Sequence, residues 1–539
     1  MGSLMSTQQA VPDTRQGGPS GPPAHARWRQ WAWPAGYVVA AVALFFCFLR
    51  VSGTQKVTSD GASNALQAWD MLHGNLLLHG WTLTDVSFWT TELPEYMLVE
   101  LIHGLGASDV HIAAALSYTL LVVLAALVAK GRKTGTEGLV RALIAAGIMI
   151  APQLGEGTLI LLLSPDHTGT GVPLLVTWLV LDRAPRRWFT PPLIGLLLTW
   201  ALMGDRIVEL LGVLPLALVC AVRVYRGVVQ RREPLRQWWF EASLVVAAVA
   251  SYIVSDLAIK AVTALGGFRV EPLKAGFAGV PAMSGNLWKT IDGILALYGA
   301  DIFGLPWHAR ALLAVVHLVG VALAAVAVWL GVRSFGRSDD LVVGVLTAGV
   351  VLNVGVYLFS TMPVTIWSTR EIAGVLPAGA VLAGRLLAGP VMRARLQPLL
   401  AAVAGVYLVA LGYGMAHPQL PAEGQDLADW LTAHHLTNGL TGYGYGPTTT
   451  LASGGQVELR QAAFSTGRAA PGPEEYNLSW YDASAHDANF LVLAAHPGPF
   501  ASLTPAQARG IFGQPAHIYR ISGGFVVWTY NTNLLTHVH

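Results

Sequence analysis

The sequence predicts a polytopic α-helical membrane protein with a C-terminal α/β domain, and three observations support this fold class. Only 12% of the 539 residues are charged, whereas soluble proteins have about 25%. Hydrophobic residues make up 53% of the chain, and the mean hydropathy is +0.51. The apolar residues gather in runs of roughly 17–25, which is the length of helix that crosses a bilayer.

About eleven helices are expected to span the membrane, and their boundaries follow the apolar runs. They lie at roughly 32–49, 109–129, 138–154, 170–182, 189–204, 207–224, 241–262, 309–332, 340–360, 371–389 and 397–415. The stretch "LGEGTLILLLSPDHTGTG", near the third and fourth of these, can alternatively form a re-entrant segment. Residues 1–30 are rich in Pro, Gly, Ser and Gln and are expected to form a disordered cytoplasmic tail.

Lysine and arginine set the expected orientation, because short cytoplasmic loops carry an excess of both. The basic segments "GRKTGTEGLVR", "DRAPRRW" and "RVYRGVVQRREPLR" lie in short loops that fall on one side. With that side cytoplasmic, the N-terminus is inside and the C-terminus outside the plasma membrane. The chain then has a transmembrane domain, 31–415, with a long first outside loop, 50–108, and an outside domain, 416–539.

The outside domain has the patterns of a small α/β fold. The stretches "QVELRQAAF", "NFLVLAA", "HIYRIS" and "FVVWTY" are typical of strands, and "EGQDLADWLTAHHL" has helical spacing. A second helix is expected in "TPAQARGIFG", with Thr504 as its N-cap and Gly513 as its end.

Several function classes are disfavoured. The net charge of +2 gives no basic surface for nucleic acid. Cys47 and Cys220 lie in apolar runs and are not expected to form a disulfide or a zinc site. The chain has neither a G-x-x-x-x-G-K-[ST] motif nor a dinucleotide fingerprint, which argues against an ATP-driven pump.

The first outside loop is the most informative segment. It is expected to contain helices at about 60–73 and 92–105, and its tryptophans suit the membrane interface. Acidic residues therefore lie near the lipid boundary: Asp60, Asp70, Asp85, Glu92 and Glu95. Asp60 and Glu92 can simply cap the two helices, or one of these carboxylates can act as a catalytic base.

This arrangement resembles the GT-C membrane glycosyltransferases, nearest to the protein mannosyltransferases and aminoarabinose transferases. The resemblance rests on the helix-bearing first loop, its early aspartate and later glutamate, the many spans and the outside C-terminal domain. It implies that Asp60 is the catalytic base and Glu92 the second acid, with Asp85 or Glu95 as alternatives. Asp60-Gly61 stands where protein mannosyltransferases commonly have Asp-Glu, which argues against a protein acceptor. The composition, with little lysine, indicates a high-GC bacterium such as an actinobacterium.

A sugar donor outside the cytoplasm is usually linked to a lipid phosphate, so the site needs a base and a cation for that phosphate. Arg370, in "STREIAGVLPAGAVLAGR", is expected at the outer start of a span, although it can instead snorkel or pair with Glu371. Arg206 in "MGDRIVEL" and Lys289 in "GNLWKTIDG" are further phosphate-binding candidates, and Arg206 can alternatively pair with Asp205.

Asp166 and His167, in "SPDHTGTG", are expected on an outside turn, where they can position substrate or simply form the turn. No cofactor is predicted, but a divalent cation stays an open alternative. A metal set can be drawn from Asp60, His73, His79 and Asp85, although the two histidines are off any single helix face.

The predicted function is transfer of a sugar from a polyprenyl-phosphate donor to an outside acceptor: a cell-envelope glycan, a glycolipid or a protein. The alternative is a secondary transporter or lipid flippase, whose polar track would be Asp205, Arg206, Glu209, Asp256 and Lys260. A third possibility is a non-catalytic membrane scaffold, in which the acids of the first loop would tolerate substitution.

Overall fold

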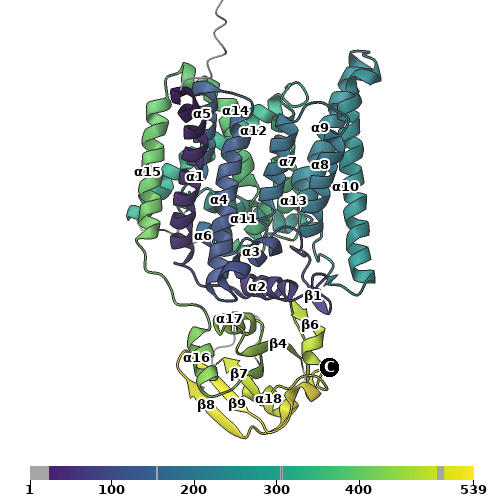
Figure 1. The fold of residues 1–539 in the computed structure, drawn as a ribbon, viewed down its shortest axis with the longest axis vertical. Helices are drawn as coiled ribbons and strands as arrows, with labels where there is room; N and C mark the ends of the chain where they lie inside the picture. The colour runs from purple at the N-terminus through teal and green to yellow at the C-terminus, as the bar shows by residue number, and fades with distance from the viewer. Residues whose placement is uncertain (1–23, 153–155, 304, 306–307, 466, 495–502) are drawn as a thin grey trace, which may run out of the picture. The chain divides into compact units, whose positions relative to one another are not determined.

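The computed structural model describes residues 24–152, 156–303, 305, 308–465, 467–494 and 503–539 (Figure 1). Most of the tail expected at 1–30 therefore lies outside the described residues. The chain divides into two compact units, Met1–Leu44 and Phe45–His539. All of the residues discussed below as functional belong to the second unit.

Each segment that was expected to span the membrane contains a helix within its described residues. Among the described residues, eight helical stretches are long and apolar enough to cross a bilayer. Six of them lie in single helices: Ala35–Ser52 of α1 (Ala24–Ser52), α4 (Ser108–Lys130), α12 (Ala309–Arg333), α13 (Leu341–Phe359), α14 (Val375–Arg393) and α15 (Gln397–Met415). The other two are composite: Glu209–Gln230 consists of η1 (Glu209–Val213), α9 (Leu214–Tyr225) and η2 (Arg226–Gln230), and Leu235–Ala264 consists of η3 (Leu235–Trp238) and α10 (Trp239–Ala264).

The other three expected spans are shorter helices: α5 (Gly135–Met149), α7 (Gly171–Arg183) and α8 (Thr190–Gly204). They contain 15, 13 and 15 residues. At about 1.5 Å of rise per residue, such helices fall short of the roughly 30 Å hydrocarbon layer. The stretch that could be re-entrant forms the six-residue α6 (Glu156–Leu161), followed by an irregular turn that precedes α7.

The first loop contains the two helices that its spacing predicts, α2 (Ser59–Leu72) and α3 (Leu93–His103). Thr58 is the N-cap of α2, and its side chain accepts a hydrogen bond from Gly61 N. A Cβ at Gly61 would collide with Val110 of α4, so glycine lets α2 pack closely on that helix. Capping is therefore done by Thr58, and the carboxylate of Asp60 is left for other contacts.

Close backbone contacts fix the loop against the end of α8. Phe88 N donates to Gly204 O at 2.9 Å, and Ser87 Oγ donates to Met203 O at 2.8 Å. A Cβ at Gly204 would collide with the side chain of Thr91. The segment between α2 and α3 is thus held in one place relative to the transmembrane helices.

A three-stranded sheet joins distant parts of the chain in the order β2-β1-β6. Its strands are β1 (Trp81–Leu83) in the first loop, β2 (Arg269–Val270) after α10, and β6 (Tyr476–Asn477) in the C-terminal region. β1 pairs parallel with β2 and antiparallel with β6. Figure 1 shows α2 and β1 at the end of the helical bundle next to β6 and α17 (Gly446–Ala452).

The C-terminal region is an α/β fold, as the sequence predicts. Its sheet has the strand order β5-β4-β3-β7-β9-β8, in which β3 runs parallel to both of its neighbours. The strands are β3 (Asn438–Thr441), β4 (Glu458–Ser465), β5 (Arg468–Pro471), β7 (Phe490–Ala494), β8 (His517–Ile521) and β9 (Phe525–Thr529), and the predicted helices are α16 (Gln425–Ala433) and α18 (Pro505–Phe512). Thr504 caps α18 through a reciprocal capping box with Gln507.

Candidate active site

A cavity of about 500 Å³ lies where the first loop, the turn before α7, the segment before α14 and the C-terminal region meet. Ten acidic or basic side chains line it: Asp60, Asp85, Asp166, His167, Glu271, Lys274, Arg370, Glu371, Glu474 and Glu475. Five of them are residues that sequence reasoning singled out for the site, namely Asp60, Asp85, Asp166, His167 and Arg370.

Arg370 connects two of the carboxylates. Its Nη1 donates to Asp60 Oδ2 and to Asp166 Oδ2, each at 3.1 Å. Arg370 is part of η5 (Ile366–Ile372), a 3-10 helix whose N-terminus is fixed by a capping box between Thr365 and Ser368. Burial would lower the pKa of Arg370, but Asp60 and Asp166 raise it, so the guanidinium stays charged. This pairing, rather than snorkelling, defines its position.

Asp166 is held by two further donors. Asn64 Nδ2 donates to its Oδ1 at 2.8 Å, and Ser164 Oγ donates to its Oδ2 at 2.7 Å. Asn64 lies four residues after Asp60, so both side chains lie on one face of α2. From that face Asp60 binds Arg370 and Asn64 binds Asp166. Only 1% of Asp166 is exposed, and burial raises its pKa although Arg370 opposes that rise.

Tyr443 reaches Asp60 from the C-terminal region. Its hydroxyl donates to Asp60 Oδ1 at 2.9 Å, and only 3% of the residue is exposed. Both oxygens of the Asp60 carboxylate are therefore bound, one by Arg370 and one by Tyr443. Sequence reasoning missed Tyr443, whose only signal is a tyrosine in the glycine-rich stretch "TGYGYG".

His167 supplies a second positive charge. Its Nδ1 lies 2.8 Å from Asp205 Oδ2, and its Nε2 lies 3.5 Å from Glu371 Oε1. Burial disfavours the charged imidazole, but Glu371 and Asp205 outweigh it and raise the pKa of His167 to about 10. The backbone of His167 has φ +59°, a left-handed conformation that is uncommon for residues other than glycine. The turn thus holds an imidazolium beside Arg370.

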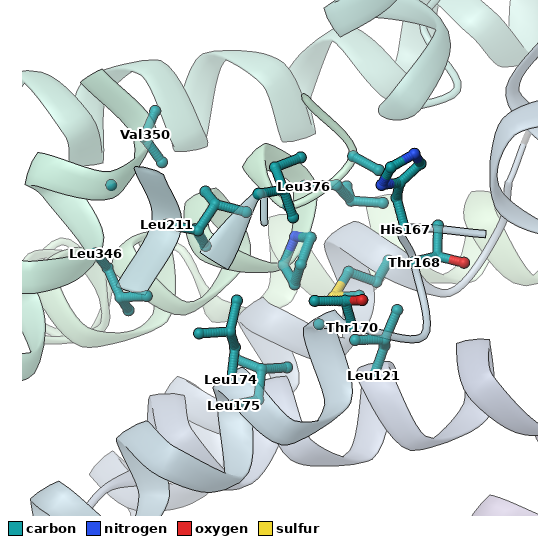
Figure 2. Close-up of a pocket in the computed structure, with 18 of the residues that line it drawn as sticks. Leu121, His167, Thr168, Thr170, Leu174, Leu175, Leu211, Leu346, Val350 and Leu376 are labelled. Atoms are coloured by element: carbon teal, nitrogen blue, oxygen red, sulfur yellow. The ribbon is translucent and has the colours of Figure 1, made fainter. Parts of the chain in front are cut away.

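A small apolar pocket of about 40 Å³ adjoins His167 from the transmembrane side. Figure 2 shows His167 and Thr168 at one end of this pocket and Leu346 and Val350 at the other. The other labelled residues are Thr170, the N-cap of α7, and five leucines of α4, α7, η1 and α14: Leu121, Leu174, Leu175, Leu211 and Leu376. His167 lines both the charged cavity and this pocket, so it stands between polar and apolar surroundings.

Glu92 lies behind the cavity and does not line it. It is fully buried, and its Oε1 accepts hydrogen bonds from Thr170 N at 2.7 Å and Thr170 Oγ1 at 2.9 Å. Although Glu92 occupies the N-cap position of α3, its side chain makes no capping bond. Burial and then Asp205 raise the pKa of Glu92 well above its usual range. Glu92 therefore supports the turn that carries Asp166 and His167.

Replacing Glu92 with glutamine is expected to preserve the fold at pH 7, whereas alanine should cost about 2–3 kcal/mol. The folded chain raises the pKa of Glu92, whereas the unfolded chain leaves it at the usual value of glutamate, so the folded state binds its proton more tightly. Folded wild type therefore loses stability as pH rises, and glutamine does not. Apparent melting temperatures of full-length protein in micelles should favour Glu92→Gln increasingly from pH 5 to pH 8. A variant that becomes relatively less stable towards pH 8 would mean that Glu92 is a buried anion.

Two cations proposed from the sequence lie elsewhere. Arg206 is exposed and pairs with Asp256 at 3.3 Å, and Lys260 binds the same aspartate at 2.6 Å. Lys289 Nζ donates to Pro363 O at 2.8 Å. Neither Arg206 nor Lys289 lines the cavity, because the turn before η1 and α11 (Met283–Leu297) direct these side chains to local partners.

The metal set drawn from the first loop is not assembled. His73 Nδ1 binds Trp69 O, and His79 Nδ1 binds Gly266 O, while Asp60 and Asp85 line the cavity. Within the described part of the chain, no three His, Cys, Asp or Glu side chains are grouped so that they could hold a metal ion.

No protein-family model and no curated protein sequence matches the chain. Among solved structures, it is similar to the oligosaccharyltransferase of Archaeoglobus fulgidus tethered with an acceptor peptide, at 11% identity and a TM-score of 0.46 over 91% of this chain and 74% of that one. The same enzyme in complex with Zn and sulfate is 11% identical, with a TM-score of 0.49 over 91% of this chain and 72% of that one. ArnT from Cupriavidus metallidurans bound to undecaprenyl phosphate is 14% identical, with a TM-score of 0.43 over 93% of this chain and 98% of that one.

These neighbours are GT-C glycosyltransferases, the group that the sequence resembles. At such identities and TM-scores the likeness concerns the course of the backbone alone.

Proposed function

We propose that the chain is a membrane glycosyltransferase that moves a sugar from a polyprenyl-phosphate donor to an acceptor outside the cytoplasm. The observation that carries this proposal is the group formed by Asp60, Arg370 and Asp166 in one cavity. Transfer from a lipid phosphate needs a base for the acceptor hydroxyl and fixed positive charge for the phosphate. Asp60 and Arg370 are those two groups.

In the proposed step, Asp60 takes the proton of an acceptor hydroxyl as the acceptor oxygen bonds to the anomeric carbon. The bond from that carbon to the phosphate oxygen breaks, and its electron pair leaves with the polyprenyl phosphate. A single displacement of this kind inverts the configuration of the sugar. Arg370 and the His167 imidazolium stabilise the charge on the departing phosphate.

The hydrogen bonds of Arg370 imply an order of binding. The guanidinium occupies Asp60 Oδ2, the oxygen that an acceptor hydroxyl would use. A donor phosphate competes for the guanidinium and frees this oxygen, while Asp166 keeps Arg370 in place. The donor therefore binds first, and the acceptor meets a base that is free to act.

The surroundings of the site fit a lipid-linked donor. The apolar pocket of about 40 Å³ next to His167 places leucines of α4, α7 and α13 close to the cations, so the phosphate end of a lipid-linked donor would meet both charged and apolar side chains. The proposed orientation has the N-terminus in the cytoplasm, which puts the cavity and the C-terminal region at the outer face of the plasma membrane. Cell-envelope glycans, glycolipids and proteins are the acceptors available there.

The proposal is tested with full-length protein in nanodiscs, radiolabelled polyprenyl-phosphate sugars and cell-envelope acceptors. We expect label to move from the lipid to the acceptor in a protein-dependent manner. Absence of transfer from every donor, together with solute uptake into vesicles that contain the protein, would overturn the proposal in favour of a transporter.

Replacing Tyr443 with phenylalanine is expected to lower kcat about tenfold with little change in KM. The lost hydrogen bond to a charged carboxylate is worth about 1.5 kcal/mol, which corresponds to about tenfold in rate if it fixes Asp60 for proton transfer. The matched control is Tyr445→Phe, two residues along the chain, whose ring contacts Phe525. Equal rates for Tyr443→Phe and wild type would remove Tyr443 from the site's function.

A further inference from the structure

Three carboxyl groups of the cavity are left without a cation. Most of the cavity's acids have one: Arg370 binds Asp60 and Asp166, His167 pairs with Glu371, and Lys274 pairs with Glu271. Among the described residues, no ion pair joins the other three, Asp85, Glu474 and Glu475, which we call the acidic wall. No ion pair within the described part of the chain therefore balances the charge that these three groups carry when they are ionised.

Glu475 makes the acidic wall more than a cluster of surface acids. Only 5% of the residue is exposed, it lines the cavity, and its Oε2 has no hydrogen-bond partner among the residues that the structure describes. Ser63 lies close enough to lower the pKa of this carboxyl group, but burying a carboxyl oxygen that has no partner is still unfavourable. A ligand that enters the cavity can supply the missing partner.

The fold holds Glu475 in this position through its backbone. Gln461 Nε2, from β4, donates to Glu474 O at 2.6 Å and to Glu475 O at 2.7 Å. The next residue, Tyr476, begins β6, which pairs with β1 of the first loop. Glu475 itself has φ +41°, a conformation that is uncommon for residues other than glycine. The backbone of Glu475 is thus held beside the cavity by two fixed elements.

Electrostatics indicates which kind of ligand would bind there. Burial and then Asp60 raise the pKa of Glu475 and of Glu474, so nearby negative charge already opposes their ionisation. A hydroxyl group would accept or donate a hydrogen bond but leave that repulsion in place. A positively charged group would remove it, and a phosphate or carboxylate would make it worse.

We propose that the acidic wall binds an ammonium group of the acceptor, so that the preferred acceptor is an amine-bearing glycan or glycolipid and anionic acceptors are excluded. That the bound molecule is the acceptor rests on the proposed function, but the binding of an ammonium group can be measured without catalysis. The carboxyl groups are not grouped closely enough to hold a metal ion among the residues described. An ammonium group on an extended sugar chain suits acids that are spread along a wall.

The test measures binding by full-length protein in phosphatidylcholine nanodiscs without a donor. The probes are a glucosamine tetramer and an N-acetylglucosamine tetramer, which differ in charge but not in backbone. We expect wild type to bind the glucosamine tetramer at least tenfold more tightly than the N-acetylglucosamine tetramer. Glu475→Gln should raise the Kd for the glucosamine tetramer at least fivefold. Glu474→Gln should act in the same direction, and this less buried position keeps the test valid if the Glu475 variant does not fold.

The matched control is Asp429→Asn, which removes an exposed acid on α16 of the same region away from the cavity. Equal affinity for the two tetramers would overturn the proposal, as would an equal loss in Asp429→Asn. Binding of MgCl₂ alone that Glu475→Gln abolishes would also overturn it, in favour of a metal. The binding test contains no donor, so a negative result in it does not contradict sugar transfer. A negative result in the transfer assay likewise does not contradict amine binding.

Discussion

Replacing Asp60 with asparagine is expected to reduce the rate of sugar transfer by about 10²–10⁴-fold, the contribution typical of a positioned base. Asparagine has nearly the same shape and can accept a hydrogen bond from Arg370, but it cannot take a proton from the acceptor. Arg370 also keeps Asp166 as a partner. The loss should therefore fall on kcat, while donor affinity and melting temperature change little.

The measurement is transfer under saturating donor, with donor binding measured separately for the same preparation. Asp70→Asn is the matched control, because Asp70 lies on the same helix and accepts hydrogen bonds from Trp81 Nε1 and Asn75 Nδ2. That substitution should alter stability by about 1 kcal/mol and leave kcat nearly unchanged. Undiminished transfer by Asp60→Asn would exclude Asp60 as the base.

Replacing Arg370 with glutamine is expected to lower transfer by about 10²–10³-fold, the usual cost of removing a preorganised electrostatic contact. It should also destabilise the fold by about 1–3 kcal/mol, because Asp60 and the buried Asp166 lose their shared cation. Donor binding should weaken as well, which distinguishes this variant from Asp60→Asn. Arg370→Lys should recover part of the activity, since lysine restores charge but not the guanidinium geometry.

The loss of stability in Arg370→Gln should depend on pH in a defined direction. Asp166 already has a raised pKa, and removing Arg370 takes away the charge that opposes the rise. A carboxyl whose folded pKa is raised loses folding stability as pH increases. The melting-temperature difference from wild type should therefore shrink from pH 8 to pH 5. A difference that grows at low pH would contradict the role of Arg370 as the partner of a carboxylate.

A glutamine at a surface arginine provides the control for both measurements. Arg206 is the suitable position, because it is exposed, pairs with Asp256 and does not line the cavity. Surface ion pairs of this kind contribute about 0–1 kcal/mol. Arg206→Gln should therefore leave both transfer and stability close to wild type.

Local patterns in the sequence predict the long helices, four strands of the C-terminal sheet and many site residues. Long apolar runs predict α4 and α12 because a segment that crosses a bilayer must form its backbone hydrogen bonds within itself. Short apolar runs rich in strand-forming residues predict β7 and β9. Asp166 and Arg370 stood out because charges are costly beside hydrocarbon. Three expected spans, α5, α7 and α8, proved too short to cross by themselves, because an apolar run does not fix where a helix ends.

Tertiary structure alone decided which of these residues act together. The bonds from Arg370 and Tyr443 to Asp60 join residues 310 and 383 positions apart, and no periodicity or spacing encodes such a pair. Glu92 and Asp60 had the same local chemistry as acids near helix starts, yet packing buried the former behind the turn and left the latter in the cavity. The sequence determines which side chains are costly to leave unpaired near a membrane. The packing of distant segments determines their partners, because burial, charge and hydrogen bonding act between neighbours in space.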